Sequence, residues 1–351
     1  MRMFRKILKI AGGVILVLIL VVMIAKLWAD STYFNDYDPA LPFNVRVEGS
    51  EVVDGTVDFF GITRDQQYEK VLFTIDARRD EPIPVLMTMP VQRSGKLPVI
   101  IFLHGIGQSK SFLERICTPF NQAGFAMVCF DQHMQGERRI RGNPLKTIKA
   151  FRQRPWKTIN DGRRLIDYLE THPEIDAERV YLIGASYGAI TGTTLTAREE
   201  RIGASVLVVG GGHLKTMLNA PMIRDGIGIA PLHWLASTFV TWLMRPADPV
   251  HYAHLTAGTP VLMQSGSEDI LVTPEAGEAL YQALGEPKEI RWYPCDHPGL
   301  RDEDAPIIVQ ILDEGLAWLL EIDAQFRTDE ELPALQAPED VSVEEDMEEA
   351  A

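Results

Sequence analysis

The sequence is poor in cysteine and in positive charge, and each shortage excludes a class of protein. It has three Cys in 351 residues, so a framework of several disulfides cannot form and at least one thiol is left over. Its 34 Lys and Arg stand against 49 Asp and Glu, a net charge of −15. Phosphate contacts need a basic face, so we expect no nucleic-acid partner. Hydrophobic residues make up 46%, enough for a large folded core, and no internal repeat occurs.

The first 30 residues form a separate unit, in which a basic stretch precedes a long apolar run. Four basic residues stand in the first nine positions, and residues 10–25 then carry no charge. A helix rises about 1.5 Å per residue, so 7–28 is long enough to span a bilayer, with Trp28 at the interface. We therefore predict a membrane anchor over 1–30, with a cytoplasmic N-terminus and the rest of the chain outside the cytoplasm.

A cleaved signal peptide is the alternative for this segment, and it would leave a secreted or periplasmic protein. Cleavage after Ala29 would put Lys26 and Leu27 in the processing site. These residues match the expected small-residue pattern poorly, which favours the anchor.

The C-terminal end has the opposite character. From residue 328 onward there are ten acidic residues and no basic one, with two prolines that would interrupt a helix. Such a composition predicts a solvated, disordered acidic tail over 326–351.

Between these ends, apolar runs typical of strands alternate with the spacing typical of amphipathic helices. The expected strands are 71–77, 83–89, 97–103, 125–131, 180–184, 204–209, 260–265 and 289–293. The expected helices are 111–123, 158–171, 185–198 and 304–322. The alternation predicts one α/β domain over 31–325, with a doubly wound, mostly parallel sheet whose first two strands form an antiparallel pair.

Residues 213–255 interrupt the alternation, because they are too many for an ordinary connection between two strands. Aromatic and apolar side chains recur there at helical spacing. They predict either helices that pack on the domain or a cap over an apolar substrate pocket, and the two are compatible. As tentative pocket residues we take Trp234, Phe239, Trp242 and Leu243.

The string Gly184-Ala-Ser-Tyr-Gly188 follows a buried strand and opens a helix. A G-x-S-x-G sequence in this setting predicts a sharp turn that exposes the serine, and its glycines let neighbouring backbone pass closely. The helix N-terminus favours the negative charge that develops during nucleophilic attack. Ser186 is therefore the candidate nucleophile.

A serine hydroxyl needs a base to take its proton and an acid to orient that base. We expect the chain order Ser, acid, His, with both partners in loops after later strands. Asp269 and His297 stand in the loops that follow the last two expected strands. Asp296 and Glu268 are the competing acids, and adjacency to the histidine makes Asp296 the poorer orienting group.

The oxyanion of a tetrahedral intermediate needs hydrogen-bond donors. One is expected from the backbone N–H of Tyr187, and the other from that of Ile106 in the loop His104-Gly-Ile-Gly107. We expect His104 to brace this loop rather than to act as the base.

No cofactor or metal is expected. Asp248, His251 and His254 could share one helix face, but Pro246 and Pro249 and the lack of a fourth ligand favour a solvated helix start.

Residues 71–320 resemble the α/β-hydrolase superfamily in motifs and in their order along the chain. The strings at 130–138 and 161–169 are similar to those of bacterial esterases near the dienelactone hydrolase and acylaminoacyl-peptidase groups. The chain departs from both groups. It has no room for the β-propeller of the peptidases, and Ser186 stands where dienelactone hydrolases use cysteine.

Together these features predict a membrane-anchored serine hydrolase that cleaves small carboxylic esters, with an apolar acyl part, through an acyl-enzyme intermediate. A serine peptidase or amidase with the same triad is one alternative. The other is a catalytically silent hydrolase fold that serves as a binding protein of the cell envelope.

Overall fold

The computed structural model describes residues 2–59, 61–140 and 142–326. Apart from residue 326, the expected tail over 326–351 lies outside the described residues. The three cysteines are free and buried.

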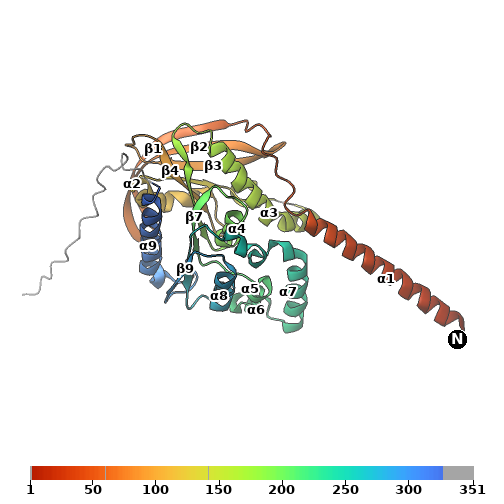
Figure 1. Cartoon of the computed structure of the whole chain (residues 1–351). Helices are drawn as coiled ribbons and strands as arrows, with labels where there is room; N and C mark the ends of the chain where they lie inside the picture. Colours follow the sequence, from red (N-terminus) through yellow and green to blue (C-terminus); the bar gives the residue numbers. More distant parts are fainter. Residues whose placement is uncertain (1, 60, 141, 327–351) are drawn as a thin grey trace, which may run out of the picture.

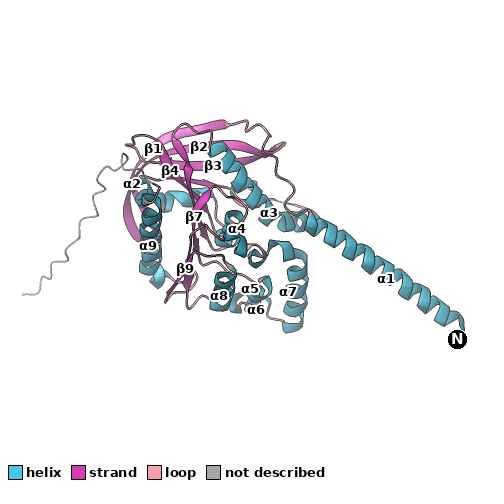
Figure 2. Ribbon diagram, viewed as in Figure 1, coloured by secondary structure: helices cyan, strands magenta, loops and turns pink. Residues whose placement is uncertain are grey.

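One nine-stranded sheet, in the order β1-β2-β3-β5-β4-β6-β7-β8-β9, organises the domain (Figure 2). Its strands are β1 Arg46–Phe59, β2 Ile62–Arg78, β3 Glu81–Met89, β4 Leu97–Leu103, β5 Ala126–Phe130, β6 Ile175–Ala185, β7 Ile202–Val208, β8 Val261–Gly266 and β9 Lys288–Tyr293. The first three strands and the β3–β5 pair are antiparallel, whereas every pairing from β5 to β9 is parallel. The predicted fold class, a mostly parallel doubly wound sheet, is confirmed.

Helices cover both faces of the sheet (Figure 1). The helices of the domain are α2 Cys117–Gln122, α3 Pro144–Leu169, α4 Tyr187–Thr196, α5 Leu214–Leu218, α6 Pro221–Ile227, α7 Ala230–Met244, α8 Pro274–Ala283 and α9 Ala305–Ala324. Buried side chains of α3, α4 and α8 share one core cluster, and those of α2 and α9 share the other. This two-layer covering explains why the parallel strands are apolar on both faces.

Two helices differ from the expected ranges. The stretch 111–123 divides into a 3₁₀ helix, Lys110–Arg115, and the short α2. The helix expected over 158–171 begins at Pro144 and contains Pro155 in its interior, a position where proline normally interrupts a helix. α8 was not expected.

The segment 213–255 holds α5, α6 and α7, followed by the 3₁₀ helices Arg245–Ala247, Pro249–His251 and Ala253–Thr256. At the other end of the chain, α1 spans Arg2–Ser31 and projects away from the domain (Figure 1). By length and composition, Gly12–Ser31 is a candidate membrane span or signal sequence, with none of it buried in the protein.

Candidate active site

A tight turn at the carboxyl end of β6 presents Ser186. Its backbone has φ 54° and ψ −116°, a conformation that costs energy for a residue with a side chain. A Cβ on Gly184 would lie 2.4 Å from the carbonyl oxygen of Gly188. A Cβ on Gly188 would lie 1.8 Å from the carbonyl oxygen of Leu103. Close backbone contacts therefore require glycine at both positions.

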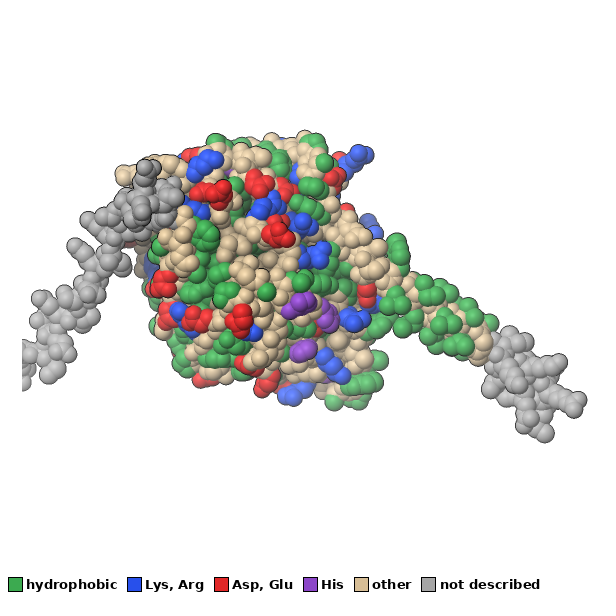
Figure 3. Space-filling view, viewed as in Figure 1, with side chains coloured by type: hydrophobic (Ala, Val, Ile, Leu, Met, Phe, Trp, Pro, Cys, Tyr) green, Lys and Arg blue, Asp and Glu red, His purple; other side chains and the backbone are tan. Residues whose placement is uncertain are grey.

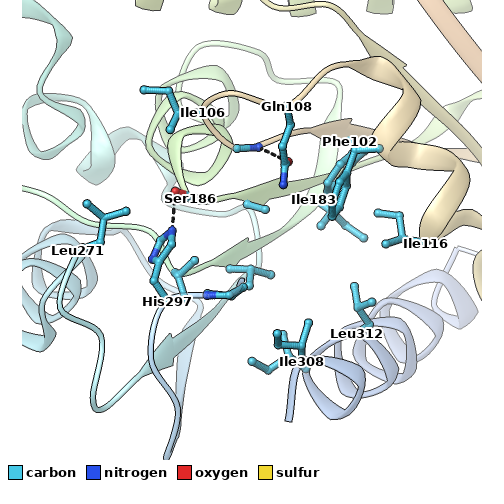
Figure 4. Close-up of a pocket in the computed structure, with 17 residues that line it drawn as sticks. Phe102, Ile106, Gln108, Ile116, Ile183, Ser186, Leu271, His297, Ile308 and Leu312 are labelled. Carbon is cyan, nitrogen blue, oxygen red and sulfur yellow. Dashed lines mark hydrogen bonds between the residues drawn. The ribbon is translucent and has the colours of Figure 1, made fainter. Parts of the chain in front are cut away.

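Three side chains from different loops form a continuous hydrogen-bonded chain at this turn. Nε2 of His297 lies 2.9 Å from Oγ of Ser186 (Figure 4). On the other side of the ring, Nδ1 lies 2.7 Å from Oδ2 of Asp269. Asp269 and His297 are buried, so the carboxylate fixes the ring in a site largely closed to solvent.

Asp269 and its two rivals have different partners. Oδ1 of Asp269 accepts hydrogen bonds from the N–H groups of Leu271 and Val272, at 2.8 and 2.7 Å, which leaves Oδ2 for the imidazole. Oδ1 of Asp296 instead accepts from the backbone N–H of Ile270 at 3.0 Å and of His297 at 2.7 Å.

Glu268 points elsewhere, since its Oε2 accepts a hydrogen bond from Arg301 at 2.8 Å near the surface. Among the three acids, Asp269 is therefore the one whose carboxylate contacts the imidazole ring of His297.

The loop after β4 lies next to Ser186. N–H of Gly105 donates to Oε1 of Gln108 at 2.9 Å, and N–H of Gly107 donates to Oε1 of Gln135 at 2.6 Å. Between them, the N–H of Ile106 has no acceptor among the described residues, and nor does that of Tyr187. The two glutamines thus hold the loop while Ile106 remains free to donate.

His104 is fully buried in this loop. Its Nδ1 lies 2.9 Å from the carbonyl oxygen of Gly105, and its own carbonyl accepts from Gln132 at 2.7 Å. Burial lowers the pKa of His104, so the ring is neutral at pH 7.

Asp248, one of the three residues weighed as metal ligands together with His251 and His254, has backbone hydrogen-bond partners. It accepts a hydrogen bond from the N–H of Leu214 at 2.8 Å and so supports the start of α5. Within 2–59, 61–140 and 142–326, no group of three or more His, Cys, Asp or Glu is arranged to hold a metal ion.

An apolar pocket of about 210 Å³ opens beside Ser186 and His297. Its walls come from the ends of β4 and β6, the segment around α2, and one face of α9 (Figure 4). The apolar side chains that form these walls include Phe102, Ile116, Ile183, Ile308, Ile311 and Leu312. Their periodicity is that of ordinary core residues, so nothing in the sequence separates them from the core.

The tentative pocket residues of 213–255 do not line this pocket. Trp234, Phe239 and Trp242 are exposed on α7 by 63, 54 and 38%, and Leu243 is partly buried beside them. The four side chains share the helix α7, as their spacing predicted, but helical spacing does not say what a helix face covers.

The strings at 130–138 and 161–169 meet in a buried ionic network. Asp161 is fully buried and accepts hydrogen bonds from Arg78 at 2.8 Å and Arg138 at 2.6 Å. Burial alone would raise the pKa of Asp161, but the two guanidinium groups outweigh it and hold the pKa below its usual value. Burial lowers the pKa of neighbouring His133 to about 4, and Arg138 and Lys157 act in the same direction.

A mostly parallel, doubly wound sheet with a strained serine after one strand and Asp and His in later loops defines the α/β-hydrolase class. The pattern of the alpha/beta hydrolase family matches residues 100–347, and the chain belongs to that family.

Curated proteins that are similar in sequence include an esterase and a peptidase. Esterase YjfP of Escherichia coli (strain K12) is 24% identical over 249 residues, which cover 67% of this chain and 94% of the esterase. Lasso peptide isopeptidase AtxE2 of Asticcacaulis excentricus is 28% identical over 228 residues, which cover 59% of this chain and 30% of the isopeptidase. Among solved structures, acetyl xylan esterase 1 from Thermoanaerobacterium sp. JW/SL YS485 matches with a TM-score of 0.58 and 20% identity, over 81% of this chain and 93% of that one.

Proposed function

We propose that this protein is a serine hydrolase that cleaves carboxylic esters of small molecules. The observation that carries the proposal is the chain Ser186–His297–Asp269, with contacts of 2.9 and 2.7 Å. These are the distances that proton transfer from a nucleophile to an oriented base requires. Similarity to an esterase along most of its length supports the same reaction.

In the first half-reaction, Oγ of Ser186 attacks the ester carbonyl carbon while its proton passes to Nε2 of His297. The carbonyl oxygen becomes an oxyanion, for which the free N–H groups of Tyr187 and Ile106 are the donors. Asp269 stabilises the imidazolium that forms.

Collapse of the tetrahedral intermediate breaks the bond to the alcohol, which takes the proton from His297 and leaves an acyl group on Ser186. In the second half-reaction, water attacks this acyl-enzyme and gives its proton to His297. The carboxylic acid then departs and Ser186 regains its proton.

The pocket supports an apolar acyl part for the substrate. It begins at Ser186 and is bounded mainly by aliphatic and aromatic side chains, so each buried methylene would contribute about 0.8 kcal/mol.

Labelling with a fluorophosphonate probe tests the proposal, because the probe reacts with an activated serine. We expect the full chain to be labelled and to hydrolyse p-nitrophenyl esters. Ser186→Ala should lose both properties, with activity reduced by about 10³-fold or more, while Ser111→Ala, an exposed control, keeps them. Labelling of Ser186→Ala to the normal extent would contradict the assignment, and absence of labelling in the native protein would favour a catalytically silent fold.

A peptidase or amidase is the second candidate, and the similarity to an isopeptidase over 59% of this chain favours it. The same triad would attack an amide, with His297 protonating an amine in place of an alcohol. Hydrolysis of aminoacyl anilides at rates that rival those of esters would support this reaction over ester cleavage.

We further propose that α1 anchors the enzyme in a membrane, with the N-terminus cytoplasmic and the domain outside. The candidate span Gly12–Ser31 has 20 residues and a mean hydropathy of 2.5. Such a helix measures about 30 Å, the thickness of a bilayer core. Retention in the membrane after alkaline carbonate washing, with protease access from outside spheroplasts, tests the anchor. Release of a chain that lacks residues 1–30 would instead indicate a signal peptide.

A further inference from the structure

α7 has an inverted distribution of side chains. Its buried positions include the polar residues His233 and Ser237, 6 and 5% exposed. Its outer face, which we define as Leu232, Trp234, Leu235, Phe239 and Trp242, is 38 to 63% exposed. The 15 residues of α7 include no Asp, Glu, Lys or Arg. A helix that faces water shows the opposite pattern, so this face is suited to an apolar medium.

The outer face of α7 is continuous with the end of α1. Nζ of Lys26, in α1, lies 5.2 Å from the centre of the Trp242 ring. Arg152 of α3 joins the two helices, because it donates to Asp30 at 2.8 Å and to the carbonyl oxygen of Leu243. α7 therefore lies on the side of the domain from which α1 projects (Figure 1).

The first turns of α3 add apolar and basic groups to the same side. Leu145 and Ile148 precede Arg152 by seven and four residues, so they share its helix face, and they are 74 and 56% exposed. Lys146 and Lys149 beside them are also exposed. Apolar residues flanked by lysines are typical of helices that lie in the interface of a bilayer containing anionic lipids.

We propose that the outer face of α7, together with the first turns of α3, is a second membrane-binding surface that seats the domain on the bilayer entered by α1. The proposal rests on the membrane anchor proposed above. The occupant is the lipid of that bilayer, because the surface adjoins the helix that would cross it. Interfacial helices lie about 5–10 Å into the boundary between headgroups and acyl chains. Figure 3 shows hydrophobic side chains along the lower edge of the domain on the side of α1.

The test uses the full chain in vesicles of phosphatidylcholine and phosphatidylglycerol, with one fluorescent label at a time. The three native cysteines are buried, so a new surface cysteine can be labelled selectively. Phe239→Cys reports on α7, Leu18→Cys on α1, and Thr56→Cys on the exposed strand β1. Circular dichroism confirms that each labelled protein is folded.

We expect the label at residue 239 to be quenched by a nitroxide lipid and to be severalfold less accessible to aqueous iodide than the label at 56. If the label at 18 is in lipid while that at 239 is as accessible as that at 56, the anchor holds and the second surface is overturned. If the label at 18 is itself accessible to iodide, the anchor and the surface both fail. Protection from iodide at 239 without quenching by the lipid would overturn the proposal and indicate a contact with another copy of the chain. Ester hydrolysis in the native protein is measured separately and depends on none of these outcomes.

Discussion

Gly188 lies so close to Leu103 that an added Cβ would stand 1.8 Å from the Leu103 carbonyl oxygen and 3.0 Å from that of His104. The helix that begins after Ser186 is thus packed directly against the end of β4. This contact brings the serine and the candidate oxyanion loop into one site.

We therefore expect Gly188→Ala to disrupt the site, because the methyl group meets backbone that cannot move aside. Overpacking in well-packed positions costs about 1–3 kcal/mol, and overlap with backbone should reach the top of this range or exceed it. Fluorophosphonate labelling and the urea midpoint measure the effect. Gly226→Ala is the matched control, since a Cβ there meets nothing within 4 Å. Equal stability and labelling of both variants would show that the elbow tolerates a side chain.

Replacement of the two neighbouring acids should separate their roles. Asp269→Asn removes the carboxylate from Nδ1 of His297 and should lower kcat by about 10³–10⁴-fold. Asp296→Asn retains an oxygen for the backbone N–H groups of Ile270 and His297, so the loss should stay below about tenfold. Steady-state kinetics on one ester compare kcat in the two variants. A larger loss in Asp296→Asn than in Asp269→Asn would identify Asp296 as the acid.

The sequence predicted those strands whose apolar runs are continuous. Leu97–Leu103 is buried at all seven positions and was expected with the same bounds. β1 was missed because it is polar and mostly exposed, so it lacks the alternation that marks a half-buried strand. α3 was expected only over 158–171, but it begins at Pro144, and the tertiary packing of this helix accommodates Pro155 in its interior.

The candidate site could be predicted where chemistry restricts the residue type and not where packing alone decides. Ser186, Asp269 and His297 stand in loops at the carboxyl ends of strands, and topology brings such loops together. Ile308 and Leu312 gave no comparable signal. Apolar residues of α9 recur at the same helical spacing whether they line the pocket or pack into the core. Their roles therefore follow from the tertiary structure.

The pocket predicts a preference for longer acyl groups. We expect kcat/KM to rise from an acetate to a butyrate or hexanoate ester. Burial of four methylenes favours binding by at most about 3 kcal/mol, which limits the rise to roughly a hundredfold. Leu312→Trp should fill part of the pocket of about 210 Å³ and flatten the rise. Trp242→Ala, on the outer face of α7, should leave the chain-length profile unchanged. A flat profile in the native enzyme would contradict an apolar acyl site, and flattening by Trp242→Ala would place α7 at the pocket after all.

The last prediction concerns acid stability and His133. Burial lowers the pKa of this side chain to about 4, whereas the pKa of a histidine in an unfolded chain is about 6.5. Between these values the unfolded chain binds the additional proton, so the free energy of unfolding should fall as the pH falls from 6.5 to 4. The contribution of neutral His133 to the free energy of unfolding is fully present above the pKa of the unfolded histidine, and it amounts to about 3 kcal/mol at most.

His133→Gln removes this titration and should reduce the loss of stability between pH 7 and pH 5, even if the variant is less stable at pH 7. Urea unfolding followed by circular dichroism at both pH values measures the difference. His254→Gln is the control, because it makes the same substitution at an exposed histidine. Burial also lowers the pKa of His104, but that residue is present in all three proteins and cancels from the comparison. Equal pH dependence in His133→Gln and the native protein would mean that His133 does not enter the unfolding equilibrium as a buried neutral side chain.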